Sequence, residues 1–323
     1  MLLDRCGRKI EYLRLSVTDR CDLRCCYCLP RGFNSYEASE HRLSLEEVDR
    51  LAGIFVGAGI SHIRLTGGEP LLRGRIVELA GRLSRHAGLA DLSLSTNGTR
   101  LATLAAGLRR AGVNRLNVSL DSLSRERFAA VTGRDVLPSV LAGLETARAA
   151  GFRLIKINMV VMVDTTDEEI DAMVAYCLER GFVLRLIETM PIGTAGRSTG
   201  FRDLQPVQQR LRRRFDLVDG VVAGGGPARY LVSADGRFQV GFITPISRHF
   251  CATCNRVRLA MDGTLYLCLG KDDKVDLRPL LRGGAGDADI LAALLAGLDA
   301  KPDGHDFDSA AHPMVRAMAS TGG

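Results

Sequence analysis

The feature that most constrains the fold is an alternation of short apolar runs with longer segments of helical periodicity, over roughly the first 240 of the 323 residues. Between most of these runs lie stretches whose apolar residues recur every three or four positions. The apolar runs are EYLRLSV, HIRLT, LSLST, NRLNVSL, RLIKINMVV and VLRLIE. Such alternation is typical of a parallel sheet with crossover helices. Because a closed barrel has eight units and only about six are present, the sequence predicts an α/β fold with an incomplete barrel.

The helical stretches carry boundary signals of their own. Ser44, three residues before Glu47, and Thr166, directly before acidic residues, each predict a helix start. Glycines predict several helix ends, because a glycine readily adopts the left-handed conformation that terminates a helix. These are Gly59, Gly112, Gly151 and Gly181.

The pattern changes after about Leu217. A glycine-rich connector, DGVVAGGGPARY, precedes two hairpin-like pieces, GRFQVGFI and RVRLAMDGTLYLCL, and a short helix, ADILAALLAGL. Asp262-Gly263 in the second piece is a turn signal. We therefore predict a partial β/α barrel over residues 1–217 and an appended C-terminal region over residues 218–323.

Composition narrows the classes of partner. The net charge is +6 and arginine greatly outnumbers lysine, which suits a polyphosphate at least as well as a nucleic acid. The chain has no tryptophan and 5% aromatic residues, which argues against a surface that stacks bases. Neither an apolar run of about 18–20 residues nor a signal-peptide pattern is present. We expect a cytoplasmic protein without nucleic-acid or membrane partners.

Six of the nine cysteines fall into two triplets, and clustered thiols in a cytoplasmic chain indicate metal or redox chemistry. Cys21, Cys25 and Cys28 are spaced C-x₃-C-x₂-C directly after the first apolar run, where a parallel fold places an active-site loop. A structural zinc ion or a ferredoxin-type cluster takes four ligands, and no fourth follows at short range. A four-iron cube held by three thiolates would leave one iron open to a small molecule.

The second triplet is spaced C-x₂-C-x₁₃-C and again lacks an evident fourth thiol. It comprises Cys251, Cys254 and Cys268. His249 could complete a zinc site, so zinc stays open beside a second iron cube that binds the substrate. Arg256 and Arg258 alternate on an expected strand and share one face, either as phosphate ligands or as a solvated surface. The leftover Cys6, Cys26 and Cys177 are expected to be small apolar residues.

Tyr27, directly before the last cysteine of the first triplet, completes a motif that resembles the radical S-adenosylmethionine (SAM) superfamily. LTGGEPLLR at residues 65–73 strengthens this resemblance, although alone it reads as a tight turn before a helix. Together with the second triplet, the opening DRCGRKIEYLRLSVTDRCDLRCCYCLP and the terminal double glycine, it resembles the GTP 3′,8-cyclase family of molybdenum-cofactor biosynthesis (the MoaA family), over essentially the whole chain.

The resemblance implies an incomplete (β/α)6 TIM-like barrel with a C-terminal extension that carries a second iron–sulfur cluster. It implies two 4Fe-4S clusters as cofactors, one on each cysteine triplet, with SAM on the first and GTP on the second. The SAM-binding residues would be Tyr27, Gly68, Glu69, Ser119 and Met190. The GTP-binding residues would be Arg14, Arg64, Thr96, Lys156, Arg256 and Arg258. A C-terminal tail ending in Gly322 and Gly323 would reach into the active site.

Several of these assignments have plainer alternatives. Arg14 and Arg64 read alone as solvent-facing strand residues, Ser119 as a polar turn residue, and Met190 as a core residue. Lys156 lies inside an apolar strand, where burying its amine costs several kcal/mol unless an anion is present. A triphosphate would supply that anion.

The implied reaction begins when a 5′-deoxyadenosyl radical takes hydrogen from the ribose C3′ of GTP. Addition to C8 of guanine and a one-electron reduction then give 3′,8-cyclo-7,8-dihydro-GTP. The resemblance also implies a reductant, a homodimer, and a cyclic pyranopterin monophosphate synthase of the MoaC type that receives the product. The alternatives are a peptide-modifying maturase of the same superfamily with an auxiliary cluster, and a zinc-stabilised binding protein without catalysis.

Overall fold

Six parallel strands form the centre of the structure, as the sequence predicts. The computed structural model describes residues 1–29, 32–34, 36–305, 307, 316 and 318–322. The strands follow one another in chain order and pair in register. They are β1 (Tyr12–Ser16), β2 (His62–Thr66), β3 (Asp91–Thr96), β4 (Arg115–Ser119), β5 (Leu154–Val161) and β6 (Val183–Glu188). The predicted β/α units are therefore present.

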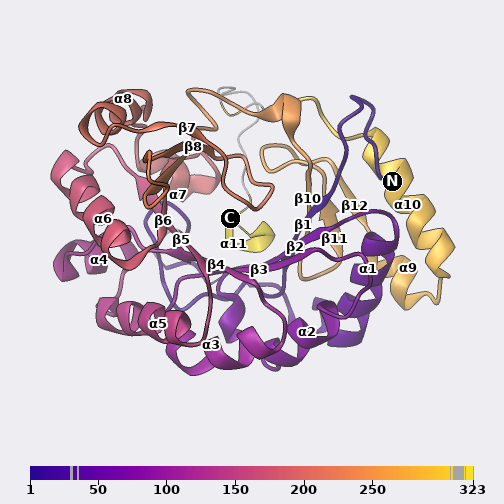
Figure 1. Ribbon diagram of the computed structural model, residues 1–323. Coiled ribbons are helices and arrows are strands. Elements are labelled where there is room, and N and C mark those ends of the chain that lie inside the picture. Colours follow the sequence, from indigo (N-terminus) through magenta and orange to yellow (C-terminus); the bar gives the residue numbers. More distant parts are fainter. Residues whose placement is uncertain (30–31, 35, 306, 308–315, 317, 323) are drawn as a thin grey trace.

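Helices cover the outer face of the curved sheet (Figure 1). The main ones are α1 (Leu45–Gly57), α2 (Ile76–Leu83), α3 (Leu101–Arg110), α4 (Arg125–Thr132), α5 (Leu137–Ala149) and α6 (Asp167–Arg180). Ser44 and Thr166 form the capping boxes that the sequence predicts. All four predicted terminating glycines have positive φ. No helix of the described residues is long and apolar enough to cross a bilayer.

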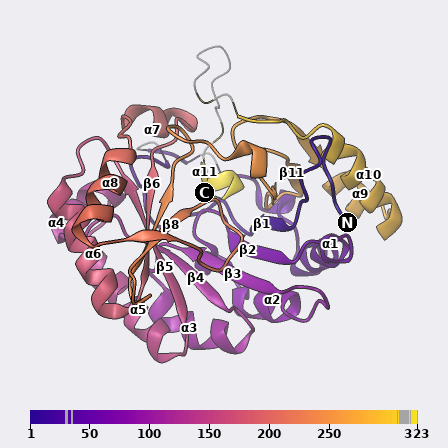
Figure 2. The ribbon, with the colours of Figure 1, turned by 45° about the horizontal axis from the view of Figure 1, so that its top comes forward.

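Shorter elements complete the chain, and among the helices of the described residues α4, α7, α8, α9 and α11 were not predicted from the sequence. The 3-10 turns are η1 (Ser39–His41), η2 (Pro70–Leu72) and η3 (Cys251–Thr253). The remaining helices are α7 (Gly193–Ser198), α8 (Gln205–Arg214), α9 (Arg278–Arg282), α10 (Asp287–Asp299) and α11 (Met318–Thr321). Figures 1 and 2 both place α11 and the C-terminal end within the curve of the sheet.

The C-terminal region extends the sheet at both of its edges. The added strands are β7 (Val218–Gly220), β8 (Arg229–Val232), β9 (Gln239–Ile243), β10 (Arg256–Leu259), β11 (Thr264–Tyr266) and β12 (Lys274–Asp276). Strand β9 pairs parallel with β6, and β10 pairs parallel with β1. The segment from β9 to β10, residues 244–255, passes from one edge to the other and carries Cys251 and Cys254. The predicted turn at Gly263 is confirmed, since it joins antiparallel β10 and β11 with a φ of 90°.

Alternation along each strand separates the core from the barrel interior. In β1, Leu13 and Leu15 are buried in the apolar core together with residues of the outer helices, such as Leu51 and Phe55 of α1. Arg14, between the two leucines, lines a cavity on the inner face. Successive side chains of a strand point to opposite faces, so a leucine-rich strand can still deliver arginine to the interior.

Two glycines after β2 let the loops that follow β1 and β2 pack backbone against backbone. Gly67 has a φ of 139°, and a Cβ atom there would lie 2.1 Å from the carbonyl oxygen of Thr18. At Gly68 a Cβ atom would lie 2.3 Å from the carbonyl oxygen of Arg20. The Gly68 amide donates to Thr18 at 2.7 Å. This contact fixes the start of the cysteine loop.

We expect Gly67→Ala to lower the free energy of unfolding by about 3 kcal/mol or more, because both the backbone conformation and the space exclude a methyl group. Gly181→Ala is the matched control, since Gly181 also has a positive φ but nothing within 4 Å of its Cβ position. Backbone strain alone should lower the free energy of unfolding of Gly181→Ala by about 1 kcal/mol. Urea unfolding measures both, and equal losses would contradict the close packing of the two loops.

Candidate active site

The first cysteine triplet lines a cavity at the carboxyl ends of the central strands. Cys21, Cys25 and Cys28 lie on the loop after β1. Four of the residues predicted to bind SAM line the same cavity. They are Tyr27, Gly68, Ser119 and Met190. The carboxyl ends of neighbouring parallel strands meet at one edge of the sheet, which is why residues so far apart in sequence converge.

Glu69, the fifth predicted SAM ligand, is fully buried and is not among the residues that line this cavity. Its carboxylate accepts hydrogen bonds from the Leu71 amide at 2.9 Å, the Thr96 hydroxyl at 2.8 Å and the Asn97 amide at 2.6 Å. Burial raises the pKa of Glu69 to about 7. These bonds tie the loop after β2 to the end of β3, so the structure gives Glu69 a supporting position.

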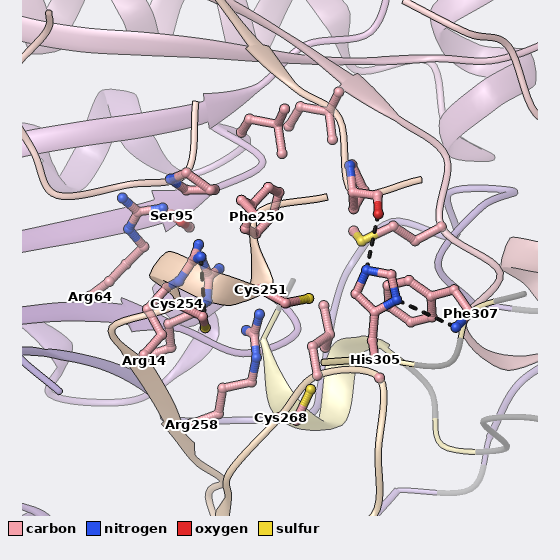
Figure 3. Close-up of a pocket in the computed structure, with 18 of the residues that line it drawn as sticks. Arg14, Arg64, Ser95, Phe250, Cys251, Cys254, Arg258, Cys268, His305 and Phe307 are labelled. Atoms are coloured by element: carbon pink, nitrogen blue, oxygen red, sulfur yellow. Dashed lines mark hydrogen bonds between the residues drawn. The ribbon is translucent and has the colours of Figure 1, made fainter. Parts of the chain in front are cut away.

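The second cysteine triplet lines a neighbouring cavity. Figure 3 shows the side chains of Cys251, Cys254 and Cys268 turned toward this cavity, next to Arg14 and Arg258. The two cavities adjoin, because four residues line both of them, and together they are called the chamber below. The shared residues are Ser95, Asn158, Ile187 and Met190.

Five arginines line the second cavity, and within the described residues none forms an ion pair with a carboxylate. They are Arg14, Arg64, Arg185, Arg256 and Arg258. The Nε of Arg14 is buried and has no hydrogen-bond partner among the described residues. Arg185 donates to the side-chain oxygens of Asn158 at 2.8 Å and Asn117 at 2.5 Å, which are both neutral. Four of these five arginines, all except Arg185, were predicted from the sequence as GTP-binding residues, and all four line this one cavity.

The clustering of these cations is costly without an anion. Burial and the nearby charge of Arg256 lower the pKa of Arg258 to about 9. Burial lowers the pKa of Arg185 to about 10, and burial with the charges of Arg258 and Arg64 lowers that of Arg14. Removing a cation from water costs several kcal/mol unless charge compensates it. The chamber therefore presents a strong positive potential that suits a polyanion.

Lys156 and Thr96, two predicted GTP ligands, do not line the second cavity. The Lys156 amine donates to the Ala223 carbonyl at 2.6 Å and to the Tyr230 hydroxyl at 3.1 Å. Burial, with the charges of Arg185 and Arg115, lowers the pKa of Lys156 to about 6. Thr96 lines the first cavity, with its hydroxyl on Glu69.

The C-terminal tail enters the chamber. Met318 and Ala319 line the first cavity, and the Gly322 carbonyl accepts a hydrogen bond from Arg258 at 2.7 Å. A Cβ atom at Gly322 would lie 2.2 Å from the Thr66 side chain, and its φ is 72°, so only glycine fits there. Gly323, the last residue of the predicted tail, lies outside the described residues.

The thiols fit clusters better than single metal ions. Within the described residues, no three or more Cys, His, Asp or Glu side chains are grouped so that they could hold one ion. A tetrahedral zinc ion needs all its ligands about 2.0–2.3 Å from one point, whereas thiolates on a four-iron cube bind separate irons. Burial raises the pKa of Cys21 to about 11 and that of Cys28 to about 12, so positive metal charge is needed to keep them as thiolates. The first triplet therefore fits an iron–sulfur cluster.

At the second triplet, positive side chains assist the thiolates. Although burial opposes ionisation, the charges of Arg256 and Lys301 lower the pKa of Cys254 to about 7. The three leftover cysteines line neither cavity. Cys177 is buried in the core, as expected, whereas Cys6 and Cys26 are exposed. The second triplet thus also offers three thiols on a cavity, in a more positive environment.

The sequence analysis missed several lining residues. They include Asn158, Arg185, Phe250, His305 and Phe307. Arg185 carries a signal that could have found it, because an arginine inside the apolar run VLRLIE needs a buried polar partner, as Lys156 does. The other four have no such signal, since they reach the cavity only through tertiary structure.

Comparison with known proteins identifies the family. Residues 15–177 match the Radical SAM superfamily, and residues 182–307 match Molybdenum Cofactor Synthesis C. Two relatives, from Ectopseudomonas mendocina and Caulobacter vibrioides, are both called GTP 3′,8-cyclase. Each is 47% identical to this chain across all of it, and the match covers 98% and 94% of the two relatives.

The chain belongs to the GTP 3′,8-cyclase family. As a member of the radical SAM superfamily, it uses a 4Fe-4S cluster and SAM. The fold is also that of Streptococcus suis SuiB bound to S-adenosylmethionine, with a TM-score of 0.63 and 13% identity over 97% of this chain and 77% of SuiB. The predicted family and barrel are thus confirmed, while the roles of single site residues stay predictions.

The buried amine of this family member generates a prediction about pH. Because the pKa of Lys156 is about 6 in the fold and near 10.5 when exposed, the unfolded chain binds more protons between these values. That contribution makes stability rise with pH from about 6 to 10.5. We expect Lys156→Met to remove this rise and to increase the free energy of unfolding at pH 7 by about 2 kcal/mol.

Urea unfolding of the ligand-free protein at several pH values measures this effect. The stability gain of Lys156→Met should be largest at about pH 6, should decline as the pH rises, and should vanish toward pH 10.5. Lys274→Met is the control, because Lys274 is exposed on β12 and should change neither quantity. A pH-independent difference would show that Lys156 stays charged in the fold.

Proposed function

We propose that the protein is a GTP 3′,8-cyclase, which converts GTP to (8S)-3′,8-cyclo-7,8-dihydroguanosine 5′-triphosphate in the first step of molybdenum-cofactor biosynthesis. One observation carries the proposal: two cysteine triplets face a single chamber whose wall holds five arginines without carboxylate partners. The name shared by the relatives supports the same activity.

Cys21, Cys25 and Cys28 would hold the first cluster, and Tyr27, Gly68, Ser119 and Met190 would hold SAM beside it. When bound and reduced, this pair supplies hydrogen abstraction from the ribose. Gly68 would let the ligand approach the backbone, since no side chain projects there. Glu69 remains a proposed contact to the SAM ammonium group, because a carboxylate can accept more than the three bonds it already has.

The arginines would bind the triphosphate and so orient the nucleotide in the chamber. Cys251, Cys254 and Cys268 would hold a second 4Fe-4S cluster that meets the guanine base. The four predicted arginines line one cavity, where they could surround several phosphate oxygens, because a guanidinium group binds such oxygens in pairs. They are Arg14, Arg64, Arg256 and Arg258. The ribose would then lie toward the four residues common to both cavities. Positioning and exclusion of water are the chain's main contributions.

The predicted contacts of Lys156 and Thr96 with GTP need a further assumption, because neither residue lines the second cavity. Lys156 would reach the triphosphate only if its bonds to Ala223 and Tyr230 give way, and a phosphate would raise its pKa again. Thr96 would act from the first cavity. We also propose that Gly322 and Gly323 complete the chamber from the C-terminal side, with Gly322 held by Arg258.

The remaining assignments extend the proposal. Residues 1–217 would form the SAM-binding barrel, and residues 218–323 the region that binds the second cluster and substrate. We propose a homodimer in the cytoplasm, where thiols stay reduced. An electron donor would reduce the first cluster, and a MoaC-type cyclic pyranopterin monophosphate synthase would take the product.

The two alternatives fit less well. A zinc-stabilised binding protein would need ligands gathered around one ion, which the described residues do not provide. A peptide-modifying maturase would not need an arginine-lined chamber, although SuiB, which has been solved with its precursor peptide SuiA, shares the fold.

Anaerobic incubation of the reconstituted protein with dithionite, SAM and GTP tests the activity. We expect 5′-deoxyadenosine and the cyclised nucleotide in equal amounts, both read by mass spectrometry. The protein should bind about eight irons per chain, as two four-iron clusters require. Two zinc ions per chain and no nucleotide product would support the binding protein instead.

A single substitution separates the two cysteine triplets. We expect Cys251→Ala to keep reductive SAM cleavage but to lose the nucleotide product by at least about a hundredfold, because the base loses its metal partner. Cys6→Ala is the control, since Cys6 is an exposed thiol that lines neither cavity. Normal product formation by Cys251→Ala would remove the second triplet from the reaction.

A further inference from the structure

The first ten residues form a small hairpin outside the chamber. Leu3 and Lys9 form an antiparallel bridge, and the Ile10 amide donates to the Leu2 carbonyl at 2.9 Å. Leu2 and Ile10 are buried in the core, which anchors the hairpin to the barrel. The opening segment that carries the family resemblance includes these residues, but the proposed reaction gives them no role.

Arg8 is a buried side chain of this hairpin, and each nitrogen of its guanidinium donates a hydrogen bond. Its Nε donates to Asp4 at 2.6 Å, and both side chains are at most 9% exposed. Its Nη1 donates to the carbonyl oxygens of Cys251 at 2.9 Å and Asp303 at 2.8 Å. Its Nη2 donates to the Pro302 carbonyl at 2.6 Å. One side chain therefore joins the hairpin to two segments that are more than 240 residues away from it and about 50 residues from each other in sequence.

The two segments that Arg8 joins both shape the second cavity. Cys251 begins η3, a single turn of three residues, so few backbone hydrogen bonds hold it. Residues 301–305 have no regular structure and lead to His305, which lines the cavity. At Gly304 a Cβ atom would lie 3.7 Å from the Cys251 sulfur, so the segments are closely packed. Buried carbonyls in irregular segments need donors, and Arg8 supplies three.

Asp4 prepares Arg8 for this role. Its Oδ1 accepts from the backbone amides of Cys6 and Arg8, both at 2.9 Å, while its Oδ2 holds the guanidinium. The Asp4 carbonyl accepts from the Gly7 amide at 2.9 Å, and Gly7 has a positive φ. The hairpin turn thus fixes the direction in which Arg8 points.

We propose that Arg8 is a positioning residue for the second cluster: it holds the Cys251 backbone at the place where the Cys251 thiolate can share one cluster with Cys254 and Cys268. This inference rests on the proposed second cluster. Arg8 itself touches neither substrate nor cluster, since it does not line the cavity. The N-terminal hairpin would therefore support a metal site whose cysteine ligands come from the C-terminal region.

Three variants of the full-length protein test the proposal. Arg8→Gln removes the clamp, and the double variant Asp4→Asn with Arg8→Gln removes it without leaving a buried, unpaired carboxylate. Arg5→Gln is the matched control, because Arg5 is on the same hairpin and pairs with Asp303, but on the surface. Each protein is reconstituted anaerobically and assayed for iron, for the electron paramagnetic resonance signals of the reduced clusters, and for SAM cleavage and nucleotide product.

We expect both variants that lack Arg8 to bind about four irons instead of about eight, and to lose or shift only the signal that Cys251→Ala also removes. SAM cleavage should stay within about twofold of the control, while nucleotide product falls at least about tenfold. Thermal unfolding before reconstitution should show that the double variant still folds cooperatively. A general loss of stability would reduce both clusters alike, so this selectivity distinguishes positioning from a merely structural role.

Two results would overturn the inference. One is a double variant with the iron content, spectra and product yield of Arg5→Gln. The other is an equal loss of iron from both clusters. If the wild-type protein itself binds only about four irons, the proposed second cluster fails first, and the inference fails with it.

Discussion

The main physical constraint on this structure is that several guanidinium groups are buried around one chamber without counter-charges. Such groups lose hydration and repel one another, which is seen in the lowered pKa values of Arg14 and Arg258. The fold tolerates this because neighbouring strands are held by a continuous ladder and an apolar core on their outer face. Neutral partners, such as Asn117 and Asn158 for Arg185, satisfy hydrogen bonds but leave the charge uncompensated. A bound triphosphate would relieve the repulsion, so the same cost that destabilises the empty chamber would favour its ligand.

The connector that follows β7 supplies backbone carbonyls to buried cations near the second cavity. The Ala223 carbonyl accepts from Lys156, the Gly224 carbonyl accepts from Arg115, and Pro227 lines the second cavity. A Cβ atom at Gly224 would lie 2.0 Å from the Arg115 side chain, so the glycine permits this close approach. The glycine-rich segment therefore brings backbone oxygens to cations that the strands have buried. These carbonyls carry only a partial negative charge. The arginines that line the second cavity therefore gain no counter-charge from the connector.

The two cysteine triplets are positioned by different means. The first follows β1 and is fixed locally, because Gly67 and Gly68 let the next loop bond to its backbone. The second lies outside the six central strands. Its first two thiols lie on the segment between the added strands β9 and β10, and Arg8 holds that segment from the N-terminal hairpin. The chamber between the triplets thus depends on contacts between both ends of the chain.

The sequence by itself determined the six β/α units, the capping at Ser44 and Thr166, and the cysteine triplets, because periodicity, caps and ligand spacing are local properties. The predicted arginines and SAM-side residues that face the chamber followed from the resemblance to the family, and they are fewer than half of the residues that line it. Only the tertiary structure decided that β9 and β10 extend opposite edges of the sheet, since strand pairing across more than 200 residues leaves no local pattern. It also decided that the Glu69 carboxylate supports the loops, that the Lys156 amine meets the connector, and that Arg8 reaches Cys251. A residue's type fixes which bonds it can make, but the packing of distant segments fixes which partner it meets.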